Sequence, residues 1–228
     1  MTGARSFRGD AIDTHPDHLR CSVYSRREYA ADAVVHLLGV TAGWSGGAWL
    51  VLSRSESLGA GSLTAVAIYA LAMAGMFTAS AAYNLMGGGW LKDYLRRLDH
   101  AFIYAAIAGT YTPLLTRLPA VTAAVALGIV WGVATAGILL KLGWPRRHER
   151  LGLILYVCLG WIGLPLIPAL SGRLLADTGP WIGAGALTYT LGVGVYLAHR
   201  VRYHNVLWHL MVLVAASFQY VAIGNEFP

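Results

Sequence analysis

Seven long apolar runs constrain this chain more than any other feature of its sequence. They lie near residues 30–52, 60–86, 100–118, 120–141, 151–170, 181–199 and 205–225. The hydrocarbon core of a bilayer is about 30 Å thick, and a helix of roughly 20 apolar residues crosses it. Lipid offers no partners for backbone polar groups, so each run must satisfy its own as a helix. The sequence therefore predicts an all-α integral membrane bundle of seven transmembrane helices.

Residues that end helices separate the runs. They include the Gly87-Gly88-Gly89 run, the Trp144-Pro145-Arg146-Arg147 segment and the Gly179-Pro180 pair. The third run is interrupted near its far end by Pro113, which is expected to kink or end that helix. We expect one compact unit, with a polar amino-terminal segment over residues 1–29 and a transmembrane domain over residues 30–228.

Composition agrees with a membrane protein. Hydrophobic residues make up 57% of the chain and charged residues 12%, whereas a soluble domain is about half apolar and a quarter charged. We expect no cleavable signal peptide, because the first 29 residues hold no short apolar run before a cleavage site. Cys21 and Cys158 are too few for a disulfide framework and are expected to be free thiols.

Basic residues predict the orientation. With the amino terminus inside, the cytoplasmic segments hold five basic residues before the first run, three after the second, four after the fourth and two after the sixth. Fourteen of the 17 Lys and Arg residues then lie inside, and only Arg54, Arg117 and Arg173 lie outside. Such a bias places the amino terminus in the cytoplasm and the carboxyl terminus outside. It also explains the net charge of +6 without nucleic acid as a partner.

Five polar residues gather at the predicted cytoplasmic ends of three helices. Ser80 and Asn84 close the second run, Asp99 opens the third, and Asn205 and His209 open the seventh. A spacing of four residues puts both members of a pair on one helix face. Polar and ionisable groups within a membrane are costly and by default indicate function. We therefore predict one cytoplasm-facing ligand-binding pocket formed by these five side chains.

Structural roles compete with this hypothesis. Asp99 is well placed as an N-cap or first-turn residue of the third helix, and it could pair with Arg96 or Arg97. His209 taken alone is more often a hydrogen-bonded interior histidine. Asn84 and Asn205 could hydrogen-bond between helices.

Other polar residues have weaker functional arguments. Ser80 alone means little, because a helical serine can bond back to its own backbone. Glu28 and His36 frame the start of the first run, where a supporting polar contact is as reasonable as a direct role.

Ordered motifs extend from about residue 28 to residue 223. They include Glu28 with His36 and Gly39, Ser80-Ala-Ala-Tyr83, Leu95-Arg-Arg-Leu-Asp-His-Ala-Phe-Ile-Tyr104, Ile107-Ala-Gly-Thr-Tyr-Thr-Pro113 and Leu207-Trp-His-Leu210. Together they resemble the hemolysin III family, bacterial relatives of the progestin and adiponectin receptors (PAQR). The resemblance implies a seven-helix bundle with a cytoplasmic amino terminus, in agreement with the count of runs and charges.

The resemblance also implies a zinc ion near the cytoplasmic helix ends, held by three histidines with a serine and an aspartate beside the metal. Ser80, Asp99 and His209 match three of these five positions, whereas Asn84 and Asn205 stand where two histidines are expected. Zinc favours nitrogen and sulfur donors, and an amide oxygen suits harder cations. The departure predicts no tightly bound cofactor. A weakly held zinc or hard cation with His209 and Asp99 as remaining ligands, a water cluster, or no ion stay open.

Two functions of different classes fit these residues. In the first, the polar pocket binds a lipid or another ligand, and the chain is a membrane sensor with a degraded zinc site. In the second, the chain is a metal-dependent hydrolase acting on a lipid amide, as in ceramidase-like enzymes. Ser80 would then stabilise an oxyanion and Asp99 would manage the proton. The two asparagines favour the sensor.

A pore or transporter is disfavoured, because no series of charged residues crosses the membrane. We expect membrane lipids as partners and a multi-pass location in the cell (inner) membrane. No residue pattern specifies an oligomeric state.

Overall fold

The computed structural model describes residues 25–144, 149–198 and 200–228, and every regular element in these ranges is helical. The elements are α2 (Arg26–Leu52), α3 (Ala60–Leu85), α4 (Trp90–Leu115), α5 (Ala120–Gly143), α6 (Glu149–Trp161), a 3₁₀ turn (Leu164–Leu166), α7 (Ile167–Leu170), α8 (Thr178–Leu197) and α9 (His204–Glu226). The prediction of an all-α fold is confirmed. The part of the predicted amino-terminal segment before residue 25, with Cys21, lies outside the described residues, and Cys158 is a free thiol.

Several helices are suited to a bilayer. Within the described ranges, five helical stretches are long and apolar enough to cross one: Arg26–Leu52, Ala60–Leu85, Ala120–Gly143, Leu151–Leu170 and His204–Glu226. The chain is therefore a multi-pass membrane protein by length and composition of its helices. Seven crossings, which also require α4 and α8, remain a prediction.

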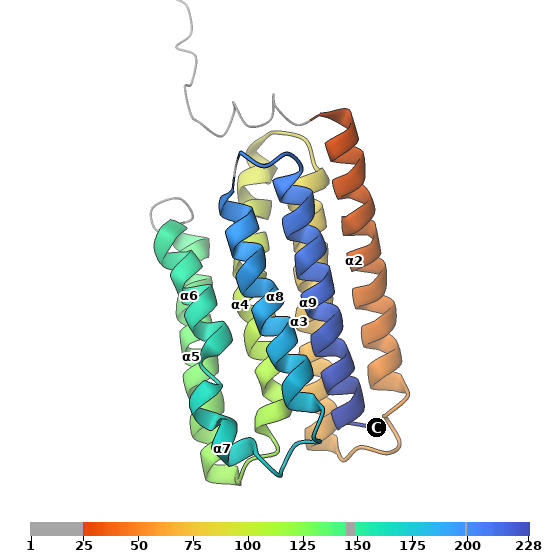
Figure 1. Ribbon diagram of the computed structural model, residues 1–228, viewed down its shortest axis with the longest axis vertical. Coiled ribbons are helices and arrows are strands. Elements are labelled where there is room, and N and C mark those ends of the chain that lie inside the picture. Colours follow the sequence, from red (N-terminus) through yellow and green to blue (C-terminus); the bar gives the residue numbers. More distant parts are fainter. Residues whose placement is uncertain (1–24, 145–148, 199) are drawn as a thin grey trace, which may run out of the picture.

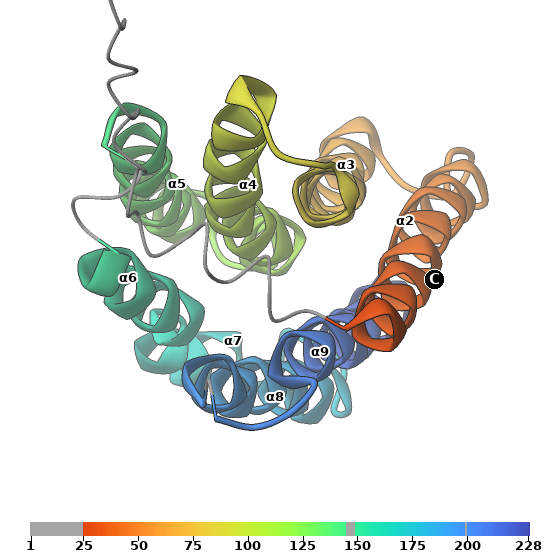
Figure 2. The ribbon, with the colours of Figure 1, turned by 90° about the horizontal axis from the view of Figure 1, so that it is seen from above.

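The helices run side by side along one axis (Figure 1) and form a ring when seen from above (Figure 2). Around that ring α2 packs on α3, α3 on α4, α4 on α5, α5 on α6, α6 on α8, α8 on α9 and α9 on α2. Buried side chains form two clusters. One, around Tyr69 and Phe77, lies where α2, α3 and α9 meet, and the other, around Tyr104 and Leu159, lies where α4, α5 and α6 meet. Both ends of α2 therefore stay next to α3 and α9.

The third helix begins earlier than its apolar run indicates. α4 starts at Trp90 with Gly89 as its N-cap, so Asp99 lies in the third turn. The prediction that Asp99 caps this helix or occupies its first turn is wrong. The polar segment before residue 100 continues the same helix on an amphipathic pattern, which apolar length alone does not detect. Pro113 lies within the last turn, and the helix ends at Leu115.

The fifth apolar run is a broken helix. α6 ends at Trp161, and a 3₁₀ turn with Pro165 and the short α7 with Pro168 follow. Prolines remove backbone donors and disturb the helical ladder. The Tyr111 hydroxyl donates to the Gly160 carbonyl oxygen (2.7 Å) and accepts from the Gly163 amide (3.1 Å). A side chain of α4 therefore satisfies backbone groups that the break exposes within the bundle.

Candidate functional site

Three helix ends are tied together at one end of the bundle. Ser25 and Glu28 form a capping box at the start of α2, in which each side chain bonds the other's backbone amide. The second carboxylate oxygen of Glu28 accepts from the amide of Tyr203, the residue before α9 (3.3 Å). The Tyr29 hydroxyl donates to the Leu85 carbonyl oxygen at the end of α3 (2.9 Å). These contacts hold the start of α9 and the end of α3 against α2.

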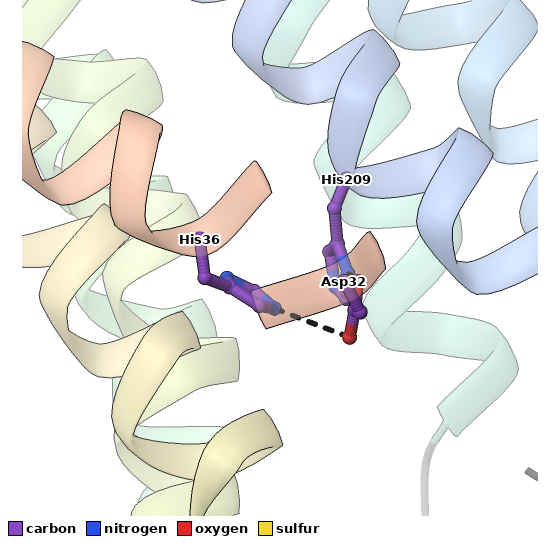
Figure 3. A group of neighbouring side chains, drawn as sticks. All are labelled: Asp32, His36 and His209. Atoms are coloured by element: carbon purple, nitrogen blue, oxygen red, sulfur yellow. Dashed lines mark hydrogen bonds and ion pairs between the residues drawn. The ribbon is translucent and has the colours of Figure 1, made fainter. Parts of the chain in front are cut away.

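Asp32, His36 and His209 meet just inside this end (Figure 3). Asp32 and His36 are four residues apart on α2, hence on one face, and both are almost completely buried. The Oδ1 atom of Asp32 lies 2.7 Å from Nδ1 of His209. The Oδ2 atom lies 3.5 Å from Nε2 of His36. The two imidazole rings are 4.3 Å apart between centroids. One carboxylate thus lies between two imidazoles.

One nitrogen of this group has no hydrogen-bond partner. Nε2 of His36 is buried and makes no hydrogen bond to any described residue, because Asp32 Oδ2 at 3.5 Å is too distant. Buried polar atoms in folded proteins are nearly always paired, so an exception needs an explanation. An absent ligand that would bind this nitrogen is one such explanation.

Ser80 and Asp99 lie next to this group. The Asp99 carboxyl is close enough to the Ser80 hydroxyl and to the His209 and His36 rings to interact with each of them. Both residues are partly exposed. The structure therefore places Ser80, Asp99 and His209 close together at one end of the bundle, and their joint function stays a prediction.

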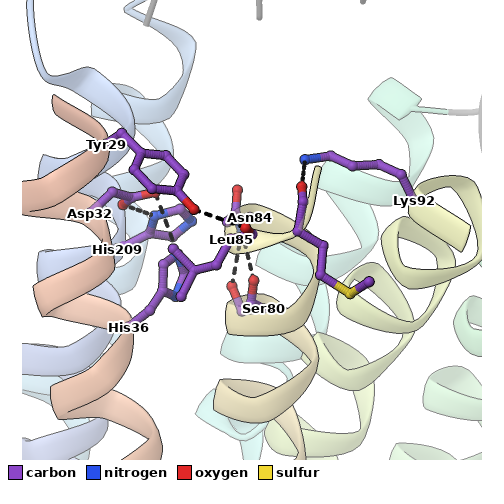
Figure 4. Close-up of polar contacts among 9 residues, drawn as sticks. Tyr29, Asp32, His36, Ser80, Asn84, Leu85, Lys92 and His209 are labelled. Carbon is purple, nitrogen blue, oxygen red and sulfur yellow. Dashed lines mark hydrogen bonds and ion pairs between the residues drawn. The ribbon is translucent and has the colours of Figure 1, made fainter. Parts of the chain in front are cut away.

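The two asparagines have a different arrangement. The Asn84 amide donates to the Ser80 carbonyl oxygen (2.9 Å) and to the Ser80 hydroxyl (3.4 Å), both on its own helix (Figure 4). Asn205 lies in the first turn of α9. Its side-chain amide makes no hydrogen bond with another described residue. Neither amide bonds an imidazole of the group. The hypothesis that all five predicted residues act together is not supported by these contacts.

Asp32 is the residue that the sequence-based reasoning missed. It is an acidic residue within the first apolar run, four residues before His36. A carboxylate inside a predicted span is itself an indication of function, and the spacing puts the two side chains on one face. That local pattern could have identified the pair. Their meeting with His209 could not have been derived from it.

An apolar groove runs along the same two helices that carry His36 and Ser80. It has a volume of about 320 Å³ and is lined by small and apolar residues of α2 and α3, among them Gly43, Trp44, Gly47, Ala48, Ala67, Ala70 and Ala74. Trp44 donates its indole N–H to the Thr78 hydroxyl at one side (3.0 Å). Gly43 is seven residues after His36, which is roughly 10 Å along a helix. The groove thus begins near the polar residues and continues away from the helix ends they occupy.

Comparison with known proteins identifies the family. Residues 26–220 match the family described as haemolysin-III related. The chain belongs to this haemolysin III family. It is 26% identical over 202 residues to a hemolysin-3 homolog of Bacillus subtilis (strain 168), covering 88% of this chain and 95% of that protein. It is 26% identical over 198 residues to hemolysin-3 of Bacillus cereus, covering 86% and 90%.

A human relative extends the comparison. The chain is 25% identical over 165 residues to the monocyte to macrophage differentiation factor of Homo sapiens, covering 68% of this chain and 67% of that protein. The predicted hemolysin III and PAQR resemblance is confirmed. The zinc site that it implies does not fit the corresponding residues here, because Asn84 bonds its own helix and offers no imidazole.

Proposed function

We propose that this haemolysin III protein is a membrane sensor that binds one lipid-like ligand near the cytoplasmic side of the bilayer. Seven spans, a cytoplasmic amino terminus, an outer carboxyl terminus and a location in the inner membrane are part of the proposal. The bias of basic residues toward one side supports the orientation. Membrane lipids are the proposed source of the ligand.

The polar residues support binding of a polar head group. Asp32, Asp99 and Ser80 provide acceptors and a hydroxyl, and the two histidines provide ring nitrogens. Asp32 and His36 are buried in an apolar bundle, which makes their hydrogen bonds strong and costly to leave unmade. A ligand with both donors and acceptors, such as an amide with a neighbouring hydroxyl, would satisfy them.

One observation carries the proposal: the polar residues and the apolar groove share α2 and α3. An amphipathic molecule needs a polar site and an apolar site within one molecular length. The roughly 10 Å between His36 and the start of the groove meets this need. An acyl chain is the proposed occupant of the groove, because it is apolar along its whole length, as is the lining.

A hydrolase is the second candidate. Ser80 and Asp99 lie beside His209, in the arrangement that a metal-dependent amidase would use for the carbonyl oxygen and the proton. Its substrate would be a lipid amide bound as described above. Release of a fatty acid distinguishes this candidate from the sensor.

The test uses the full chain in detergent with a radiolabelled N-acyl amino alcohol lipid. We expect saturable binding with no release of labelled fatty acid. Ala48 is exposed at the groove, so Ala48→Trp should fill it and weaken binding by roughly tenfold or more. Ala124, exposed on α5, provides the matched control Ala124→Trp, which should bind normally.

Equal binding by the two tryptophan variants would exclude the groove as the acyl-chain site. Fatty acid release by the wild-type chain would replace the sensor with the hydrolase. No saturable binding of lipids with several head groups would exclude both.

A further inference from the structure

We propose that Asp32, His36 and His209 form a site for one divalent transition-metal ion, and that zinc is the ion it takes. The site uses two residues of α2 that the family resemblance does not assign to the metal. It keeps His209 as the shared ligand. The proposal goes beyond lipid binding and does not depend on it.

The donor set suits zinc. Two imidazole nitrogens and one carboxylate oxygen are a common ligand set of zinc sites with three protein ligands. Such sites leave the fourth coordination position of the metal open. Imidazole also selects zinc and similar metals over magnesium or calcium, which need more oxygen ligands. One ligand atom from each of Asp32, His36 and His209 lies within 4.8 Å of the other two.

The distances require only a small adjustment. Ligands at about 2.0–2.1 Å from a tetrahedral zinc are about 3.3 Å apart. Asp32 Oδ2 and His36 Nε2 already lie 3.5 Å apart. The 2.7 Å hydrogen bond between Asp32 Oδ1 and His209 Nδ1 would open as both side chains turn toward the ion. Both rings belong to regular helices, α2 and α9, so side-chain rotation is sufficient.

The buried ring nitrogen of His36, which has a contact to Asp32 but no hydrogen bond, is a second observation. Its side chain is 3% exposed, and Nε2 makes no hydrogen bond. Figure 3 shows this ring directed at Asp32. Its contact with Asp32 Oδ2, at 3.5 Å, is longer than the hydrogen bond that a buried ring nitrogen normally makes. A metal ion would provide a closer partner for this nitrogen.

The local charge favours a cation. The carboxylates of Asp32 and Asp99 both face His209 and His36. Nδ1 of His100 is a second buried ring nitrogen without a hydrogen bond, but Lys141 and Arg96 lie close enough to repel a metal there. Arg96 also acts on Asp99, so the carboxylate of Asp32, whose charged neighbours among the described residues are only the two imidazoles, distinguishes this group from the other buried imidazole.

The first experiment measures zinc in the full chain purified without chelator. We expect about one zinc ion per chain, removed by a strong chelator and restored by zinc alone. Asp32→Asn and His36→Ala should each lower zinc affinity by roughly tenfold or more. Asn84→Ala and Asn205→Ala, at the positions that the resemblance implies, should bind zinc as the wild type does.

A cysteine variant separates a ligand from a packing residue. Asp32→Cys places a thiolate one atom closer to the backbone, the longer zinc–sulfur bond of about 2.3 Å offsets part of this difference, and thiolate is a good zinc ligand. It should retain zinc where Asp32→Ala loses it. Loaded with Co²⁺, it should gain a thiolate-to-cobalt absorption band that the wild type lacks. Every variant is first compared with the wild type by helical content and size-exclusion profile.

Wild-type chain that takes up no zinc would overturn the proposal. So would a zinc affinity of His36→Ala equal to that of the wild type, or an Asp32→Cys variant without the cobalt band. These results concern metal only, so they stand apart from the outcome of lipid binding.

Discussion

Asp32 and Glu226 are both almost completely buried, but they lie at opposite ends of the bundle with different surroundings. Glu226 closes α9, and Arg117 lies 3.0 Å from its Oε1 atom. Its Oε2 atom accepts from the Thr178 hydroxyl and the Leu175 amide, both at 2.9 Å. This carboxylate is therefore neutralised and hydrogen-bonded by groups from two other segments.

Asp32 has no arginine or lysine partner among the described residues, and its neighbours are two imidazoles. Nε2 of His36 lies 3.5 Å from this carboxylate and makes no hydrogen bond. A buried charge with complete partners stabilises an arrangement of helices. A buried carboxylate without a cationic side-chain partner can still bind a positively charged ligand. We therefore assign a structural role to the end of the bundle that holds Glu226 and a ligand-binding role to the end that holds Asp32.

The largest effect is expected at the Glu226 end. Arg117→Leu leaves the Glu226 carboxylate buried without its cation, which should lower the free energy of unfolding by about 3–5 kcal/mol. Denaturant unfolding in mild detergent, followed by circular dichroism, measures it. Arg173→Leu is the control outside this network and should change stability by about 0.5 kcal/mol or less. Equal stability of the two variants would contradict the structural role.

Zinc should stabilise the chain through the other end. At a free zinc concentration of about 100 times Kd, binding adds about 2.7 kcal/mol to the free energy of unfolding. The wild type and Arg117→Leu should both show this increment, and Asp32→Asn should not. The same unfolding experiment with and without zinc measures it. If Arg117→Leu lost the zinc-dependent increase in unfolding free energy and Asp32→Asn kept it, the roles assigned to the two ends of the bundle would be exchanged.

Glu28 should have a smaller effect, because its partners at the helix start are the neutral backbone amides of Ser25 and Tyr203. Glu28→Ala removes half of the capping box and the acceptor for the Tyr203 amide. A loss of about 1 kcal/mol in unfolding free energy is expected. Glu28→Gln keeps one acceptor oxygen for the two backbone amides of Ser25 and Tyr203 and should recover part of the loss. A full loss in the glutamine variant would show that charge, not capping, matters here.

Asn84 should have the smallest effect. Its amide bonds only to Ser80 on the same helix, so Asn84→Ala should change stability by about 0.5 kcal/mol or less. Thermal unfolding with and without zinc checks this and should show an unchanged response to the metal. Loss of the zinc response in this variant alone would return the metal site to the position that the family resemblance implies.

Several features followed directly from sequence patterns. The boundaries of α3, α5 and α9 were predicted to within two residues, because apolar length and glycine or proline breaks determine them locally. The start of α4 was not predicted to this accuracy. A polar, amphipathic segment that begins at Trp90 extends this helix ahead of its apolar run. Ser80, Asp99 and His209 were predicted together from their depth alone.

By itself, the sequence determined a helical membrane protein of the haemolysin III family and the end of the bundle where polar residues gather. Only the tertiary structure decided which of them meet. Asp32 and His209 are 177 positions apart, and their contact depends on the rotation of α2 against α9. That rotation is set by packing, such as the close approach of Gly46 to the Tyr220 ring of α9, and by the bond from Tyr203 to Glu28. Hydropathy along one helix measures depth in the membrane, and it does not record which face turns toward a neighbour.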